Sequence, residues 1–331
     1  MDLKSKKFLV IGGAGFIGSH VVTELLKEDV AQVLIFDNLA RGKLSNVEEQ
    51  LKDPRCTVFE AGGDVREIDI LNKAMEGMDG VFHLAAMWLL HCKDFPRTAF
   101  DVNIQGTFNV LEACVNNKIE RLVYSSSASV YGDAVEVPMT EEHPFNNKNF
   151  YGATKIAGEA MARAFHDRYG LNYVGLRYMN VYGPHQDQTA AYTGVIPIML
   201  NKIDANETPE INGDGSQAYD FVTVQDVGRC NVLAMQSDKN DEFYNVGTGV
   251  QTSIKELCEK ILEITNSKLT VKYKPYSPED LRRMVQNRIG CPEKARRDLG
   301  FSHRSNLETG LKELISWRNL NQLKESNDSS L

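Results

Sequence analysis

Apolar residues in the first half of the chain gather in short runs, separated by longer stretches with helical periodicity. The runs predict buried strands at Phe8–Ile11, Val33–Phe36, Thr57–Glu60, Val81–Leu84, Leu122–Ser125 and Tyr173–Leu176. The periodic stretches predict helices at Ile17–Lys27, Ile70–Met75, Ala99–Asn116 and Gly152–Tyr169. Because strands alternate with helices, we expect an α/β fold in which a doubly wound parallel sheet has helices on both faces.

The pattern becomes irregular after Gly183-Pro184, where long polar loops appear. Helices are still expected at Gly194–Ile203, Val224–Met235, Ser253–Thr265 and Leu307–Asn319. The last residues, Asn321–Leu331, are polar, so we expect them to form a flexible tail. A length of 331 residues suits either one large domain or two fused ones.

Composition and charge exclude several classes of protein. Apolar residues make up 42% of the chain and charged residues 25%, which excludes disorder throughout. A formal net charge of −8 argues against a nucleic-acid-binding surface, which is normally basic. No apolar run approaches the roughly 20 residues that span a bilayer, and the glycines within Gly12–Gly18 disfavour a signal peptide. Six scattered cysteines without a C-x-x-C pair predict no zinc site, no disulfide framework and a cytoplasmic location.

The segment Gly12–Gly18, with the sequence GGAGFIG, lies between the first predicted strand and the first predicted helix. Its glycines let the backbone turn tightly and approach a pyrophosphate, while the helix N-terminus offers free N–H groups to that anion. This position between strand and helix, more than the glycines alone, indicates a dinucleotide site.

Residues at the ends of the following strands extend this prediction. Asp37, 19 residues after Gly18, would accept hydrogen bonds from the adenosine ribose and repel a 2′-phosphate, which favours NAD over NADP. The alternative for Asp37 is a loop cap, and nearby Arg41 and Lys43 keep NADP open. We predict that the cofactor contacts Gly12, Gly15, Phe16, Ile17, Gly18, Asp37, Asn38, Asp64, Val65, Leu84, Ala85, Ala86, Tyr151 and Lys155.

Tyr151 and Lys155 are four residues apart at the start of a predicted helix, so their side chains share one face. A tyrosine with its ordinary pKa of about 10 is a poor base at neutral pH, but a nearby ammonium and a cationic nicotinamide would both lower that pKa. Ser127, in the hydroxyl-rich end of the fifth strand, would orient a substrate oxygen toward Tyr151. The alternative for these serines is to satisfy backbone groups.

Together these motifs resemble the extended short-chain dehydrogenase/reductase family, and within it the nucleotide-sugar epimerase and dehydratase branch. The resemblance continues over nearly the whole chain, through Arg177–Pro184, Gly213–Gln217, Asp220–Val222 and Asn245–Gly249. It implies that Tyr151 is the general base, that Lys155 holds the nicotinamide ribose and lowers the pKa of the tyrosine, and that Ser127 is the third catalytic residue.

The resemblance also implies a Rossmann-type sheet with a smaller, mainly helical C-terminal substrate lobe. We expect residues 1–178 and about 220–250 to form the NAD-binding domain, about 179–219 and 251–320 to form the lobe, and 321–331 to be the tail. A homodimer through the helices near 99–116 and 152–169 is implied as well. Small residues such as Ala160 and Ala164 would allow close helix approach, although packing within one chain explains them equally.

The family's dehydratases carry an Asp-Glu pair after the catalytic hydroxyl residue, and its decarboxylases carry a Glu two residues after it. This chain has Ala128 and Ser129 there. The resemblance therefore implies a nucleotide-sugar 4-epimerase acting on a hexose, N-acetylhexosamine or hexuronate through a transient 4-keto sugar. A dehydratase, decarboxylase or keto-sugar reductase of the same family is the alternative, followed by a dinucleotide-binding regulator without catalysis.

The substrate half departs from the family pattern at Tyr219, where many members have a diphosphate-binding arginine. Arg282, Arg283 or Arg288 would compensate, unless Arg282 and Arg283 form an exposed basic pair. If Arg288 faces the sugar, a hexuronate carboxylate would find a partner there. We predict that the substrate contacts Met87, Ser127, Tyr151, Asn180, Val195, Tyr219 and Arg282. An aromatic side chain in the segment Met87–His91 would stack on the sugar, or the segment would pack in the core. The expected chemistry needs no metal ion.

Overall fold

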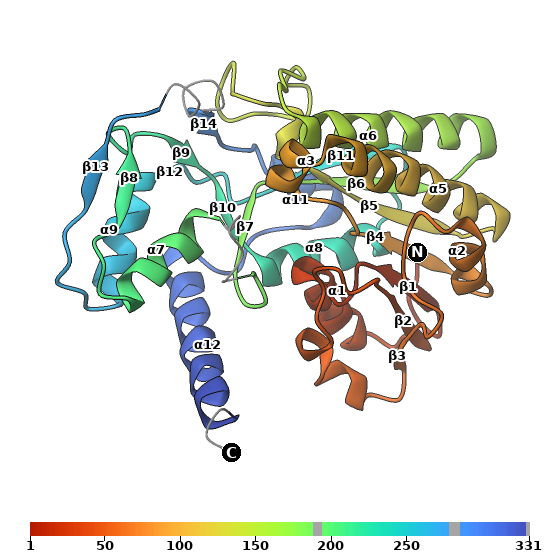
Figure 1. Cartoon of the computed structure of the whole chain (residues 1–331). Helices are drawn as coiled ribbons and strands as arrows, with labels where there is room; N and C mark the ends of the chain where they lie inside the picture. Colours follow the sequence, from red (N-terminus) through yellow and green to blue (C-terminus); the bar gives the residue numbers. More distant parts are fainter. Residues whose placement is uncertain (188–193, 278–284, 329–331) are drawn as a thin grey trace.

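A parallel sheet of seven strands lies at the centre of the computed structural model, which describes residues 1–187, 194–277 and 285–328 (Figure 1). In sheet order the strands are β3 (Cys56–Val58), β2 (Gln32–Phe36), β1 (Lys7–Ile11), β4 (Gly80–His83), β5 (Arg121–Ser127), β6 (Tyr173–Tyr178) and β11 (Glu242–Val246). The order reverses between β1 and β4, as in doubly wound folds that bind ligands at this point. The predicted α/β class is confirmed.

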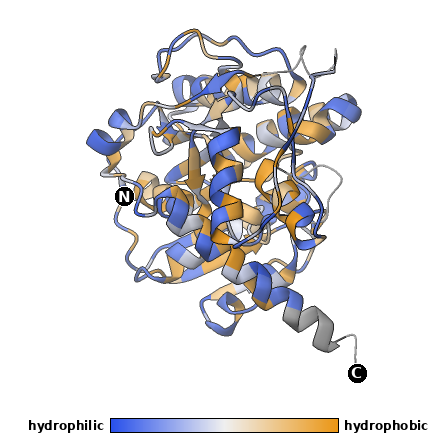
Figure 2. Ribbon diagram, turned by 90° about the vertical axis from the view of Figure 1, so that its left-hand side faces the viewer, coloured by the Kyte–Doolittle hydropathy of each residue, from blue (hydrophilic) through white to orange (hydrophobic). Residues whose placement is uncertain are grey.

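Strand alternation divides the core into two layers. Phe8 and Val10 of β1 belong to the apolar cluster under α1 (Phe16–Leu26) and α8 (Val224–Gln236). Leu9 and Ile11 belong to the cluster under α2 (Ile68–Met75), α5 (Gly106–Asn116) and α6 (Phe150–Tyr169). Because successive strand side chains point to opposite faces, the short all-apolar runs in the sequence reflect burial on both sides. In Figure 2 the helices accordingly carry hydrophobic and hydrophilic stretches side by side.

Six of the seven sheet strands were predicted, with shifted ends. The third strand spans Cys56–Val58 and not Thr57–Glu60, while the fifth and sixth continue to Ser127 and Tyr178. The seventh, β11, was not predicted, because a buried Asn245 interrupts its apolar pattern.

The predicted helix over Ala99–Asn116 is wrong over its first third. Phe100–Gln105 form a π-helical turn, and α5 begins only at Gly106; two short helices, α3 (Leu89–Asp94) and α4 (Pro96–Ala99), precede the turn. The wide turn buries Asn103, whose amide accepts from Met87 N (2.7 Å) and donates to Met87 O (2.8 Å) and the Thr154 hydroxyl (3.1 Å). Through these hydrogen bonds of Asn103, the π-helical turn holds the loop after β4 against α6.

The C-terminal lobe has its own apolar cluster, which includes Met199, Leu257 and Leu311. Its helices are α7 (Val195–Asp204), α9 (Ile254–Ile264) and α12 (Leu307–Asp328). Its short strands form small sheets: β8 (Glu210–Asn212) with β13 (Lys272–Lys274), and β12 (Thr252–Ser253) with β9 (Ala218–Tyr219) and β14 (Asn287–Arg288). The lobe is joined to the sheet by β7 (Asn180–Tyr182) paired with β10 (Phe221–Thr223) and by α11 (Glu293–Leu299).

The last helix is longer than predicted. α12 continues past Asn319 to Asp328, so the tail expected from 321 onward is helical over its first eight residues, and 329–331 lie outside the described part of the chain. It projects away from the rest of the lobe (Figure 1). None of the helices in the described residues is long and apolar enough to cross a membrane. All six cysteines are unpaired.

Candidate active site

A cavity of about 580 Å³ opens at the carboxyl ends of the central strands. Every residue predicted to bind the cofactor lines it, and so does Met87. The set comes from the loops after β1, β2, β3 and β4 and from the first turns of α1 and α6. Parallel strands bring these separate loops to one edge, because all their carboxyl ends face the same way.

The glycine loop makes a cradle that only glycine allows. Gly12 has a φ of +83°, and a Cβ at this residue would lie 2.8 Å from the Ala85 nitrogen. A Cβ on Gly18 would lie 2.0 Å from the Gly12 carbonyl oxygen. Gly15 precedes α1 without any side-chain cap, and the first turn holds no acidic residue. The N–H groups of that turn are therefore available to an anion, which fits the pyrophosphate of a dinucleotide.

Asp37 lies at the end of β2, next to the cradle. Its carboxylate accepts from the nitrogens of Ala14 (3.0 Å) and Leu39 (2.9 Å). Burial raises the pKa of Asp37, and these two hydrogen bonds oppose the rise. Gly63, which carried no sequence signal, packs so tightly here that a Cβ would lie 2.2 Å from the Asp37 carbonyl carbon.

Arg41 lines the same cavity. Its guanidinium carbon lies 4.9 Å above the Trp88 ring, and one of its nitrogens is 3.6 Å from the Asp187 carboxylate. Trp88 also lines the cavity, and its indole nitrogen is buried without a hydrogen-bond partner among the described residues. The aromatic segment after β4 therefore contributes to the site as well as to packing.

Tyr151 and Lys155 project from the start of α6, which the Asn149 side chain caps by accepting from Gly152 N (2.8 Å). Lys155 is buried, donates to the Ser125 carbonyl (2.6 Å) and lies 5.8 Å from the centre of the Tyr151 ring. The Ser127 side chain lies close enough to Tyr151 to oppose the rise in the pKa of the phenol, and it accepts from Ser129 N (3.1 Å). The structure thus brings the three predicted catalytic residues together.

Burial shifts the pKa values of both catalytic side chains. It raises the pKa of Tyr151 to about 12, although Ser127 and the charge of Arg288 oppose the rise. Burial lowers the pKa of Lys155 to about 8. Desolvation thus outweighs the neighbouring protein groups. The two cations expected to lower the pKa of Tyr151 are Lys155 and the oxidised nicotinamide, and the second of them belongs to the cofactor.

The predicted substrate residues other than Met87 and Tyr151 do not line this cavity. Asn180 is held by the Asp220 carbonyl, to which its backbone nitrogen (2.9 Å) and its amide (3.2 Å) both donate. Val195 begins α7, and the Tyr219 hydroxyl donates to the Val285 carbonyl (2.9 Å). Arg282 and Arg283 lie outside the described residues.

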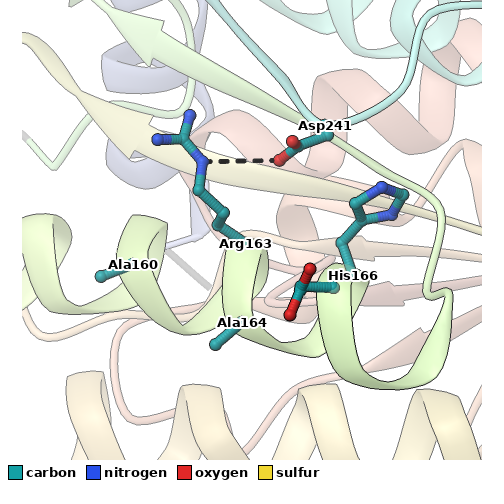
Figure 3. A pocket seen from close by; sticks show the side chains of 6 residues that line it. Ala160, Arg163, Ala164, His166 and Asp241 are labelled. Carbon is teal, nitrogen blue, oxygen red and sulfur yellow. Dashed lines mark ion pairs between the residues drawn. The ribbon is translucent and has the colours of Figure 1, made fainter.

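A second hollow lies on α6, away from the glycine loop. It is lined by Ala160, Arg163, Ala164, His166, Asp167 and Asp241, and no predicted catalytic or binding residue reaches it (Figure 3). Arg163 and Asp241 form an ion pair across it at 3.5 Å. Its lining offers no nucleophile or anion cradle, so the chemistry belongs to the first cavity.

Comparison with known proteins bears on this site. The model of the NAD-dependent epimerase/dehydratase family matches residues 8–247. A UDP-glucose 4-epimerase of Halalkalibacterium halodurans is 30% identical over 328 residues, covering 93% of this chain and 94% of the relative. A UDP-N-acetylglucosamine 4-epimerase of Methanobrevibacter ruminantium, solved with UDP-N-acetylmuramic acid, superposes with a TM-score of 0.89 at 33% identity, covering 96% and 99% of the two chains. A dTDP-glucose 4,6-dehydratase of Streptomyces venezuelae, solved with NAD, has a TM-score of 0.87 at 27% identity, covering 96% and 98%.

Proposed function

This chain belongs to the NAD-dependent epimerase/dehydratase family, and we propose that it is a nucleotide-sugar 4-epimerase with tightly bound NAD. The observation that carries the proposal is the Ser127–Tyr151–Lys155 group at a cavity built for a dinucleotide, with no carboxylate in the turn that follows Ser127. The epimerase activities named for the Halalkalibacterium and Methanobrevibacter relatives support it.

Each catalytic side chain has a task that its position allows. Tyr151 takes the proton of the sugar 4-hydroxyl and later returns it, which is general acid–base catalysis. Ser127 holds the same oxygen in line with Tyr151, since its side chain lies beside that phenol. Lys155, fixed by the Ser125 carbonyl, holds a positive charge beside the phenolate. NAD⁺, which the glycine loop and Asp37 would hold, would supply the hydride acceptor for C4 of the sugar.

The turn after Ser127 favours epimerisation over the alternatives. Ala128 and Ser129 are buried in this turn, and neither side chain acts as a carboxylate base. Dehydration needs an acid and a base to remove water across the ring, and decarboxylation needs a group that promotes loss of the carboxylate. The Streptomyces dehydratase has the same fold, so the distinction rests on these two residues and not on architecture.

We extend the proposal to a homodimer through α5 and α6. Phe100 and Phe108, on the π-helical turn and on α5, are 46% and 44% exposed, and Phe150 at the start of α6 is 58% exposed. A second copy covering these rings would remove apolar surface from water. Light scattering on the purified protein tests this, and Phe108→Glu should shift a dimer toward the monomer. We also propose a cytoplasmic location, consistent with six unpaired cysteines.

The decisive experiment compares Tyr151→Phe with Tyr169→Phe on the same helix, where the control ring is 58% exposed. Each variant is incubated with nucleotide hexoses, N-acetylhexosamines and hexuronates, and the epimers are separated chromatographically. We expect Tyr151→Phe to lose at least 100-fold in rate and Tyr169→Phe to match the wild type. Normal turnover by Tyr151→Phe would refute the mechanism. A 4-keto-6-deoxy product would indicate a dehydratase, and net consumption of added NADH a reductase.

A further inference from the structure

The ammonium of Lys155 is buried with few groups to stabilise its charge. Lys155 is 5% exposed, and its only hydrogen bond among the described residues goes to the Ser125 carbonyl (2.6 Å). No carboxylate in this part of the chain forms an ion pair with it. Glu159, one turn later on α6, accepts instead from Arg177 (2.7 Å) and from the Ser126 hydroxyl (2.5 Å). Because a buried charge without a countercharge is costly, the other surroundings of the ammonium decide whether it stays protonated.

The ring of Tyr124 lies against this ammonium. Tyr124, on β5, is 1% exposed, and the Lys155 nitrogen is 5.3 Å from the centre of its ring. A cation at this distance over the face of an aromatic ring is attracted by the ring quadrupole, most strongly where water is excluded. Tyr124 does not line the cofactor cavity, so it acts through Lys155 and not on a ligand.

The catalytic helix makes room for this ring. A Cβ on Gly158, in the middle of α6, would lie 2.0 Å from the Tyr124 hydroxyl oxygen. Glycine inside a helix is unfavourable relative to alanine, so α6 loses stability by admitting the phenol. No hydrogen bond compensates for this loss, because the hydroxyl is buried without a partner among the residues that the structure describes. What the site gains is therefore the face of the ring beside Lys155.

Lys294 shows how a lysine beside a ring differs when a carboxylate is present. Its nitrogen lies 5.0 Å from the centre of the Tyr244 ring, but it also pairs with Glu242 at 2.6 Å. The charge of Lys294 is therefore compensated without the ring. Lys155 has no such ion pair in the described part of the chain, so the ring of Tyr124 carries more of the stabilisation of its charge.

We propose that Tyr124 is a positioning residue for the catalytic lysine, and that the face of its ring holds the Lys155 ammonium beside Tyr151 and keeps it charged. This inference rests on the proposed function. Lys155 lies between two rings, 5.3 Å from the centre of Tyr124 and 5.8 Å from that of Tyr151. Tyr151 gives up and regains its proton, whereas burial raises the pKa of Tyr124 well above its ordinary value of about 10. Tyr124 therefore stays neutral and offers the same ring face throughout the reaction.

Few groups near Lys155 change their charge between about pH 6 and pH 9. The titratable or charged groups around it are Cys92 on α3, His83 on β4, Tyr124 on β5, and Tyr151 and Glu159 on α6. Burial raises the pKa of the Cys92 thiol to about 11 and lowers that of His83 to about 3, so both are neutral in this range. Glu159 is committed to its ion pair with Arg177. A titration of Lys155 in this range therefore reports on its own surroundings and on the catalytic phenol.

Nuclear magnetic resonance of the NAD-loaded protein, isotope-labelled at its lysine side chains, measures the pKa of Lys155, and Lys155→Arg identifies its signal. Tyr124→Leu removes the ring, and Tyr124→Phe removes only the hydroxyl. A trifluorinated phenylalanine at position 124 keeps the shape of the ring but withdraws electrons from its face. The matched control is Tyr244→Leu, which removes a fully buried ring from β11 that faces Lys294 instead.

We expect Tyr124→Leu to lower the pKa of Lys155 by about 0.5 to 1.5 and the trifluorinated residue to lower it by about half as much. Tyr124→Phe should restore the wild-type value, because it keeps the ring face, and the control should leave the value unchanged. The alkaline limb of the pH–rate profile for epimerisation should move to lower pH by the same amount in each variant, because the protonated lysine is the active form.

The same pKa of Lys155 with phenylalanine and with its trifluorinated analogue would overturn the proposal, and so would an equal fall in Tyr244→Leu. If Tyr124→Leu does not fold, the comparison of the two phenylalanines decides, because both keep the packing of the ring. The pKa is measured without turnover. A protein in which the pKa of Lys155 responds as expected, but whose wild type epimerises no nucleotide sugar, would refute the proposed function alone.

Discussion

The buried ion pair between Glu159 and Arg177 provides the sharpest test of how the site is held. Glu159 is on α6, one turn after Lys155, and Arg177 is on β6. They are 4% and 5% exposed, and their closest nitrogen–oxygen distance is 2.7 Å. Glu159 also accepts from the Ser126 hydroxyl (2.5 Å), next to Ser127. The ion pair therefore links the catalytic helix α6 to β6, and the Ser126 hydrogen bond links Glu159 to β5, the strand that ends in the catalytic serine.

Glu159→Gln keeps the shape of the side chain but leaves Arg177 as a buried charge without a countercharge. Breaking one side of a buried pair costs about 3–5 kcal/mol. For 331 residues, the entropy of unfolding near 60 °C is roughly 0.7 kcal/mol per kelvin. The expected fall in Tm is therefore about 4–7 °C. We also expect a lower kcat, because the contact between α6 and β6 weakens next to the catalytic helix face.

Differential scanning calorimetry of the NAD-loaded protein, with NAD content measured in parallel, checks this expectation. The control is Glu293→Gln, which breaks the exposed pair with Arg296 and should change Tm by less than about 1 °C. A Glu159→Gln protein with full NAD content and a Tm within 1 °C of the wild type would refute the reasoning. It would mean that Arg177 is satisfied by Tyr131 and the Glu141 carbonyl alone.

Three further perturbations follow from the site. Gly18→Ala places a Cβ 2.0 Å from the Gly12 carbonyl oxygen, so the affinity for NAD, measured by fluorescence titration, should fall at least about tenfold. The circular dichroism spectrum should not change. An unchanged affinity would contradict the role of the glycine loop in NAD binding. Asp37→Ser should reduce the preference for NAD over NADP, measured as the ratio of their dissociation constants. An unchanged ratio would show that Asp37 does not contact the adenosine ribose. Burial lowers the pKa of His20 to about 4 and that of His83 to about 3, while the unfolded chain takes up these protons near pH 6.5. The free energy of unfolding, measured with urea, should therefore decrease as the pH falls below about 6.5, and His83 should contribute up to about 1.4 kcal/mol per pH unit. His83→Asn should remove this contribution to the pH dependence. The same pH dependence in the variant and the wild type would show that His83 is not the cause.

Much of the cofactor site could be predicted because each of its signals is local. The apolar run Phe8–Ile11 identifies a strand buried on both faces, and the glycines that follow it meet a requirement of a single turn. The four-residue spacing of Tyr151 and Lys155 follows from helix geometry alone. These features depend on neighbours in the chain, so the amino-acid pattern reports them.

The features that the sequence did not predict depend on contacts between distant residues. The π-helical turn before α5 buries Asn103 against Met87, 16 residues away, and no periodicity signals it. The desolvation that raises the pKa of Tyr151 comes from the packing of several elements around one phenol. The neighbourhood of Arg288 depends on β14 pairing with β9, 69 residues apart in register. β11 was not predicted because a buried asparagine is unusual in a strand. The Asn245 amide finds its hydrogen-bond partners far away in the sequence, at Met139 O (2.9 Å) and the Tyr131 hydroxyl (2.8 Å).

The sequence by itself determined the fold class, the dinucleotide cradle and the residue types of the catalytic group, because strand burial, glycine turns and helical spacing are properties of short segments. The tertiary structure alone decided which charges are paired and which are not. Arg177 and Arg288 look alike in the sequence, yet Arg177 is paired with Glu159, whereas the Nε of Arg288 is buried without a hydrogen-bond partner among the described residues. That difference arises from long-range packing, since the energy of a buried charge depends on every group brought around it by folding.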